Sequence, residues 1–102
     1  MATDCIVIRI CVRQKVREMC FAGTSVSDDD IGNKKISDLH LGQGAHMPGV
    51  SPLQALVVKL GSCTDVKIPN LTENKLNSNP NWTVDDLSGF ICAETKIIKG
   101  EI

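Results

Sequence analysis

The sequence is poor in aromatic residues and carries almost no net charge. It has 102 residues, no tyrosine, and only three aromatic side chains, which are Phe21, Trp82 and Phe90. Eleven Lys and Arg residues against 12 Asp and Glu give a formal net charge of -1. Nucleic acids and anionic membranes are attracted by positive charge, and single-stranded nucleic acids also stack on rings. Neither a nucleic acid nor a membrane is therefore expected as a partner.

Long apolar runs are also missing. The longest ones, such as 5–8 and 55–58, fall far short of the roughly 18 to 20 residues that span a bilayer. The first residues, Met-Ala-Thr-Asp, lack the basic and then apolar regions of a secretory signal. We therefore expect a cytoplasmic protein, or a secreted one if a signal peptide has been removed.

The five cysteines, at positions 5, 11, 20, 63 and 92, are too scattered for a standard metal site. No Cys-x-x-Cys pair occurs, and His40 and His46 do not supply the closely spaced ligands of structural zinc. With no Gly-rich phosphate loop either, neither a metal nor another cofactor is expected. An odd number of cysteines leaves at least one thiol unpaired within the chain. Two Asn-x-Thr triplets, which start at Asn70 and Asn81, would matter only in a secreted protein.

The N-terminal residues alternate in the manner of a half-buried strand. Every second position from Ile6 to Val12 is a branched apolar residue, which predicts a strand over 5–13. Weaker alternation predicts a second strand over 16–22. The polar residues of 23–35 predict a solvated loop.

The rest of the chain predicts one helix among further strands. A short strand is expected over 36–41, followed by a loop over 42–52 that holds three Gly and two Pro. Ser51 then resembles an N-cap with Pro52 at the first helical position, and apolar residues recur at helical spacing up to Leu60, so a helix is predicted over 52–62.

The C-terminal residues predict an exposed connection and a closing strand. The connection is expected over 69–81, and the strand over 89–99. Asp85 and Asp86, after Thr83, are expected to cap a helix start or to lie in a solvated turn. The whole chain, 1–102, is therefore expected to form a single α+β domain in which antiparallel strands pack on one central helix.

One stretch resembles a known family of enzymes. Residues 49–64 read GVSPLQALVVKLGSCT, in which a Ser-Pro opens a helix and Cys63 lies eleven residues after Pro52. This pattern is similar to the central helix of the OsmC and Ohr thiol peroxidases, and the preceding Gly-rich residues are similar to that family's loop. The resemblance covers residues 42–64 closely, and residues 82–101 more weakly.

The resemblance implies that Cys63 reduces organic hydroperoxides at the expense of a thiol reductant. In the family an arginine from the N-terminal strands activates the cysteine, so the candidates here are Arg9, Arg13 and Arg17. The family's second helix, with its resolving cysteine, has no counterpart in the chain. Another cysteine, Cys20 or Cys92, is therefore expected to resolve the oxidised thiol, and a second copy of the chain is expected to complete the fold as a homodimer.

Elementary chemistry leaves a non-enzymatic alternative open. A cysteine at the C-terminal end of a helix faces the negative end of the helix dipole, which disfavours the thiolate unless a cation compensates. Without that cation, Cys63 would be a small buried hydrophobe. The chain would then be a β-rich binding or assembly subunit, such as a viral or structural protein or an extracellular all-β sandwich. For the sandwich, residues 38–42 and 60–63 loosely resemble the zona pellucida N-type module.

Overall fold

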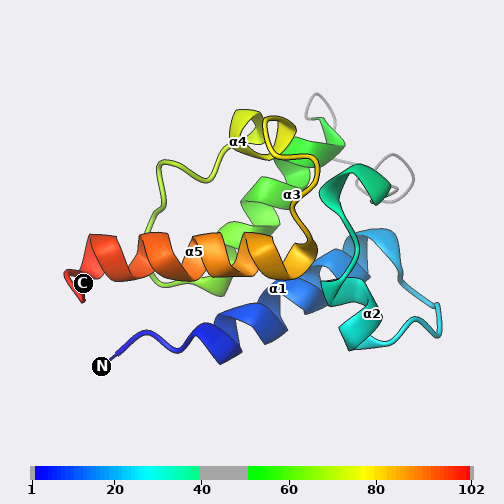
Figure 1. The fold of residues 1–102 in the computed structure, drawn as a ribbon, viewed down its shortest axis with the longest axis horizontal. Coiled ribbons are helices and arrows are strands. Elements are labelled where there is room, and N and C mark those ends of the chain that lie inside the picture. Colours follow the sequence, from blue (N-terminus) through cyan, green and yellow to red (C-terminus); the bar gives the residue numbers. More distant parts are fainter. Residues whose placement is uncertain (1, 40–50, 102) are drawn as a thin grey trace.

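The computed structural model describes residues 2–39 and 51–101, and within these ranges the protein is helical (Figure 1). The elements are α1 (Cys5–Cys20), α2 (Asp28–Gly32), the 3-10 helix η1 (Ile36–Asp38), α3 (Pro52–Leu60), the 3-10 helix η2 (Gly61–Cys63), α4 (Glu73–Asn77) and α5 (Val84–Lys99). The described residues contain no sheet, and their one β-bridge joins Lys35 to Thr83. The predicted α+β fold with antiparallel strands is therefore wrong, and so is the all-β alternative.

The two strands predicted at the N-terminus are one helix, α1. Asp4 caps this helix, because its Oδ1 accepts a hydrogen bond of 2.9 Å from the backbone N–H of Ile6. The buried residues are Ile8, Val12, Val16 and Met19, which follow one another at intervals of four or three residues. Ile8 and Val12 fit a period of two as well as the helical period, so the alternation misled the prediction.

The closing strand predicted over 89–99 lies within α5. Thr83 and Asp86 form a capping box at its start, with both reciprocal hydrogen bonds at 3.0 Å. At the other end Gly100 adopts a left-handed backbone with φ of 74°, a common way to end a helix. The buried side chains, Val84, Leu87, Ser88, Ile91, Cys92 and Thr95, again follow helical spacing.

A helix is present where one was predicted over 52–62: α3 covers residues 52–60, and residues 61 and 62 lie in η2. Ser51 Oγ accepts a hydrogen bond of 3.1 Å from the N–H of Gln54, and Pro52 occupies the first turn. Where a strand was predicted over 36–41, residues 36–38 form η1, and residues 40 and 41 lie outside the described residues. The predicted loop over 23–35 contains α2, and the connection over 69–81 contains α4. Residues 40–50, which include most of the predicted Gly-rich loop, lie outside the described residues.

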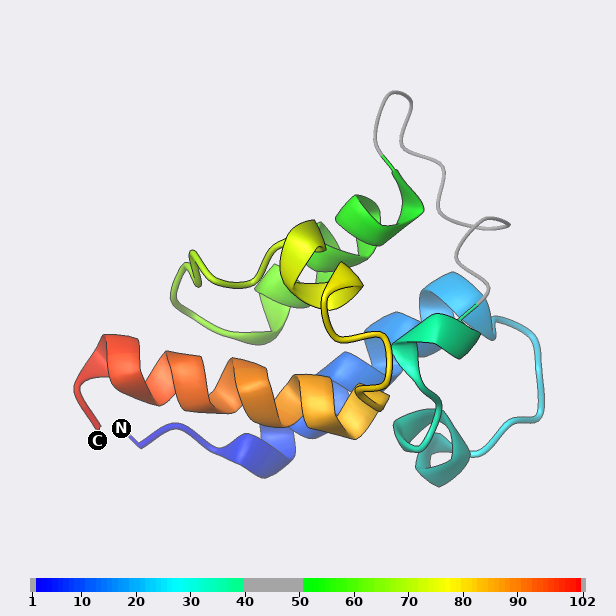
Figure 2. The same cartoon turned by 45° about the horizontal axis from the view of Figure 1, so that its top comes forward.

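The longest helices, α1 and α5, run antiparallel side by side. At one end Thr3 bonds to Glu101, and further along Arg13 of α1 bonds to Asp85 of α5. Figure 2 shows α3 and α4 together on one side of this helix pair. The buried apolar side chains of all these helices form one cluster. In the described part of the chain, no helix is long and apolar enough to cross a bilayer.

Candidate functional site

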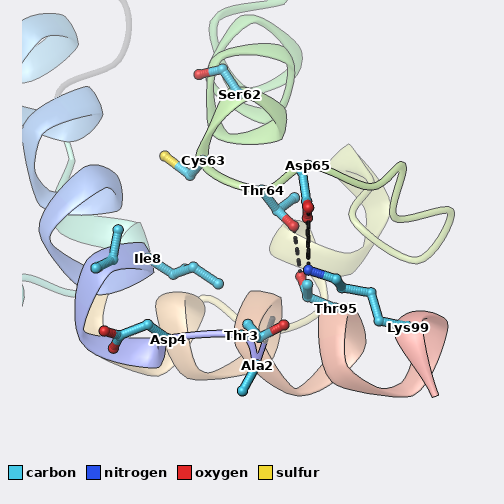
Figure 3. Close-up of a pocket in the computed structure, with 11 residues that line it drawn as sticks. Ala2, Thr3, Asp4, Ile8, Ser62, Cys63, Thr64, Asp65, Thr95 and Lys99 are labelled. Carbon is cyan, nitrogen blue, oxygen red and sulfur yellow. Dashed lines mark hydrogen bonds and ion pairs between the residues drawn. The ribbon is translucent and has the colours of Figure 1, made fainter. Parts of the chain in front are cut away.

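Cys63 lies in η2, directly after α3, and is joined to Cys11 of α1. The two Cα atoms are 5.6 Å apart, and the cysteines form a disulfide. Both residues are half-buried. In Figure 3 the sulfur of Cys63 points toward α1, away from Thr64 and Asp65. The residue predicted as a nucleophile is therefore present here in its oxidised form.

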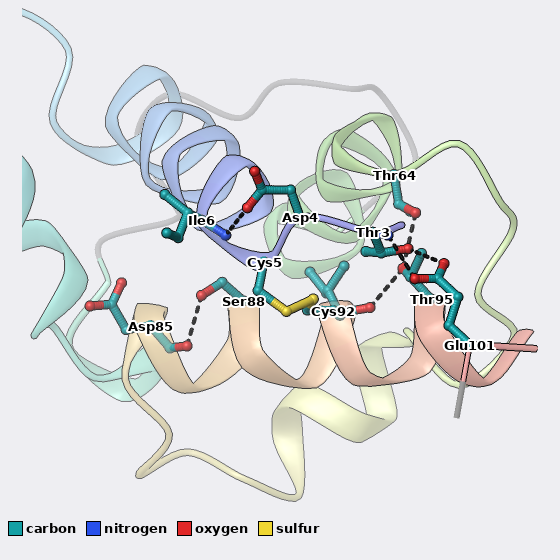
Figure 4. The surroundings of a disulfide bond; sticks show 11 residues. Thr3, Asp4, Cys5, Ile6, Thr64, Asp85, Ser88, Cys92, Thr95 and Glu101 are labelled. Carbon is teal, nitrogen blue, oxygen red and sulfur yellow. Dashed lines mark hydrogen bonds between the residues drawn. A yellow bond between two sulfur atoms is a disulfide. The ribbon is translucent and has the colours of Figure 1, made fainter. Parts of the chain in front are cut away.

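A second disulfide joins Cys5, at the start of α1, to Cys92 in the middle of α5 (Figure 4). Their Cα atoms are 5.4 Å apart. Cys92 is buried and 1% exposed, so this bridge passes into the core. Cys92 is one of the two cysteines predicted to resolve Cys63, but the structure pairs it with Cys5. The spacing of the cysteines along the sequence could not predict either disulfide, because each bridge joins elements that are far apart in the sequence.

Cys20, the other candidate for resolving Cys63, is the free cysteine of the described chain. It is the last residue of α1 and packs half-buried against the core cluster. Burial raises the pKa of its thiol to about 11. Because the thiolate is the reactive form, Cys20 is a poor nucleophile at neutral pH.

Arg13, a predicted activator of Cys63, instead connects α1 to α5 and α2. Its Nε and Nη2 donate to the two carboxylate oxygens of Asp85, at 2.9 and 2.6 Å, and its Nη1 donates to Asp29 at 3.1 Å. The hydrogen bonds to Asp85 raise the pKa of Arg13 and lower that of Asp85. The bidentate pair joins α1 to α5, and the contact to Asp29 adds α2.

The other two predicted arginines are also placed elsewhere. Arg17 donates to the backbone carbonyl of Val26 and to Asp28, the latter at 2.9 Å. Arg9 lines a small depression between α1 and α5, together with Cys5 and Asp85. Cys11 leaves α1 on another side, toward η2, so the structure does not bring these arginines together with Cys63.

We predict that Asp85 makes folding stability depend on pH in the acid range. Its folded pKa is lowered, first by the hydrogen bonds from Arg13, so it stabilises the protein fully above the unfolded pKa of about 3.9. That contribution is lost as the pH falls through the lowered folded pKa. Asp85→Asn should therefore be less stable than wild type at pH 7, and the difference should shrink as the pH falls below 4. Urea unfolding at several pH values measures this, and a difference independent of pH would contradict it.

An open cavity of about 430 Å³ lies beside Cys63 (Figure 3). Its polar groups are already paired, since Thr64 and Thr95 share a hydrogen bond of 2.9 Å and Lys99 contacts Asp65 at 3.2 Å. The hydrogen bond from Lys99 lowers the pKa of Asp65. The described lining therefore forms a solvated hollow next to the disulfide, without an unpaired buried polar group that would select a ligand.

The structure also exposes a group of aliphatic side chains that the sequence analysis assigned to the faces of a strand. Ile6, Val7 and Ile10 are 60, 59 and 51% exposed. On α1 they lie within little more than one turn, on the side opposite the buried Ile8 and Val12. We call these three residues the α1 apolar face. A helical wheel of residues 5–20 would have found it, had the helix been recognised.

The remaining ionisable residues form no metal centre in the part of the chain described here, where no three His, Cys, Asp or Glu side chains converge. His40 and His46 lie outside that part. Comparison with protein-family models, curated proteins and solved structures finds no match to this chain.

Proposed function

We propose that the chain is a non-enzymatic assembly module that associates with a second copy of itself through the α1 apolar face. One observation carries this proposal. Ile6, Val7 and Ile10 are large, exposed and adjacent on a helix whose other side is fully packed. Grouped aliphatic side chains of this kind mark contact surfaces more often than scattered ones do.

The disulfides support this use of α1. Cys5 and Cys11 directly flank residues 6–10, and each is tied to a different element of the fold. The backbone that carries the apolar face is thus held at both ends. A surface fixed in advance loses less conformational entropy when it binds than a mobile one does.

The chemistry of the face favours a second copy as its occupant. The only ionic residue between Cys5 and Cys11 is Arg9, which lines the depression beside α5 together with Ile6 and Asp85. An uncharged apolar face complements itself, as a twofold contact requires. Antiparallel packing of two α1 helices would place Ile6 of one copy near Ile10 of the other. Three side chains make a small contact, below the roughly 1,200 Å² of a stable interface, so the association is expected to be weak.

The test is the concentration dependence of mass in solution. Sedimentation equilibrium of the oxidised protein should show reversible dimerisation, and Ile6→Glu should weaken it by at least tenfold because the charge would occur twice across the contact. Ile97→Glu is the matched control, since Ile97 is also 60% exposed but lies on α5. A monomer at all concentrations, or an equal loss in Ile97→Glu, would overturn the proposal.

The two disulfides also favour an oxidising compartment for this module, because structural disulfides form and persist in such compartments. We therefore propose an oxidising compartment in place of the cytoplasm predicted from the sequence. It corresponds to the secreted alternative of the sequence analysis.

The pairing of Cys63 with Cys11 favours a second candidate function, the thiol-dependent reduction of a hydroperoxide. Reduced Cys63 would attack the O–O bond, become a sulfenic acid and release an alcohol. The thiol of Cys11 would condense with it to give the disulfide and water, and an external dithiol would reduce both again. The proximity of the two cysteines supports this scheme, with Cys11 in the resolving role predicted for Cys20 or Cys92.

This candidate predicts a fast and selective reaction of the reduced protein. One equivalent of cumene hydroperoxide should give one equivalent of alcohol and the Cys11–Cys63 disulfide, and Cys63→Ser should abolish the reaction. In the matched Cys11→Ser variant, dimedone should trap a sulfenic acid at Cys63. Oxidation no faster than that of free cysteine would exclude the peroxidase.

A further inference from the structure

We propose that Asn81 is a site of N-linked glycosylation, an inference that rests on the oxidising compartment proposed above. Asn81, Trp82 and Thr83 form an acceptor triplet, as do Asn70, Leu71 and Thr72. A triplet alone is a weak signal. The structure adds where each triplet lies and what each asparagine contacts.

Both triplets occupy the same structural position. Asn70 and Asn81 are exposed and lie in turns, and each precedes by two residues a threonine that caps a helix. Thr72 caps α4 and Thr83 caps α5. An acceptor asparagine in the mature fold must leave its side chain in solvent, and both turns meet this requirement.

The two asparagines differ in the use of their amide nitrogen, the atom that receives the sugar. The Nδ2 of Asn70 donates a hydrogen bond of 2.8 Å to the Oε1 of Glu94, on α5. A sugar on that nitrogen would replace a hydrogen and crowd the surface of α5. Asn81 lies in the exposed turn between α4 and α5, where Trp82 N–H donates to the carbonyl of Asn79 at 3.1 Å. Of these two side-chain amides, only that of Asn70 has a hydrogen-bond partner among the described residues, and this contrast selects Asn81.

The modification is a transfer without oxidation or reduction. The amide nitrogen of Asn81 bonds to the anomeric carbon of an oligosaccharide carried on a polyprenyl diphosphate. The bond from that carbon to the phosphate oxygen breaks, the diphosphate leaves with the electron pair, and the amide loses one proton.

The test directs the full chain into the endoplasmic reticulum of a eukaryotic cell with a cleavable leader, and measures its intact mass after alkylation of free thiols. We expect a discrete added mass that peptide N-glycosidase removes, converting the linked asparagine to aspartate at position 81. Asn81→Gln should abolish the added mass, and the control Asn70→Gln should keep it. Thr83→Ser, which retains a hydroxyl for both the triplet and the cap, should also keep it.

The same spectra test the glycosylation site and the disulfides separately. Two disulfides and a glycan at Asn81 support the site and the disulfides on which the proposed compartment depends. Two disulfides with no glycan, or with one at Asn70 alone, would overturn the glycosylation site alone. Five alkylated thiols would show that the disulfides do not form even in an oxidising compartment, and would overturn both the compartment and the inference that depends on it.

Discussion

Removal of the Cys5–Cys92 disulfide by a double substitution, Cys5→Ala with Cys92→Ala, is expected to destabilise the protein by about 4 to 5 kcal/mol. The bridge joins residues 87 positions apart, so it restricts nearly the whole unfolded chain. Loop-closure entropy for a ring of this size gives that figure. A domain of this length has a total stability of about 5 to 15 kcal/mol. The variant should therefore be marginally folded.

Equilibrium urea unfolding under non-reducing conditions measures this loss. Cys20→Ala is the matched control, because it removes a half-buried cysteine of the same helix that forms no bridge. Removing the Cys11–Cys63 bridge, which spans 52 residues, should cost about 0.5 kcal/mol less in loop entropy. If reduction of wild type left the unfolding midpoint unchanged, the disulfides would contribute no stability and the prediction would fail.

The helices differ in how well the sequence predicts them. The start of α3 is predictable because Ser51 and Pro52 are local signals that act within one turn. The start of α5 has a comparable signal in Thr83 and Asp86, but the apolar residues that follow, such as Phe90 and Ile91, fit a buried strand equally well. In α1 the β-branched residues favour a strand. The segment is nevertheless a helix, because its buried residues lie at helical intervals on one side.

The candidate site was harder to predict than the helices. Which cysteines meet depends on how α1 packs against α5 and η2, and five cysteines at irregular spacing leave many pairings open. The arginines were selected by analogy with strands that the protein does not have. In the structure Arg13 finds its partner 72 residues away, in Asp85. Such contacts follow from the tertiary fold, so a pattern within one segment does not reveal them.

Gly32→Ala is expected to destabilise the protein by about 1 to 3 kcal/mol, although alanine is normally the better helix former by about 1 kcal/mol. Gly32 is buried in α2, and the pair formed by Arg13 and Asp85 packs directly on its Cα. A Cβ at this position would lie 2.6 Å from Asp85 Oδ2 and 2.7 Å from Arg13 Nε. The two side chains must then move apart or away from α2, which disturbs a bidentate contact between a largely buried Arg13 side chain and a partly exposed Asp85 side chain.

A glycine-to-alanine control in the same protein should change the folding stability in the opposite direction. Gly89 is exposed within α5, and a Cβ there would meet nothing within 4 Å, so Gly89→Ala should stabilise by up to about 1 kcal/mol. Thermal and urea unfolding of both variants measure the contrast. Arg13→Ala removes two of the three atoms that the added Cβ would meet and releases the third, Asp85 Oδ2, from its partner, so Gly32→Ala should be less harmful in that background. If it were equally harmful with and without Arg13, its cost would come from another contact of α2, and the ion pair would not be the reason for glycine at position 32.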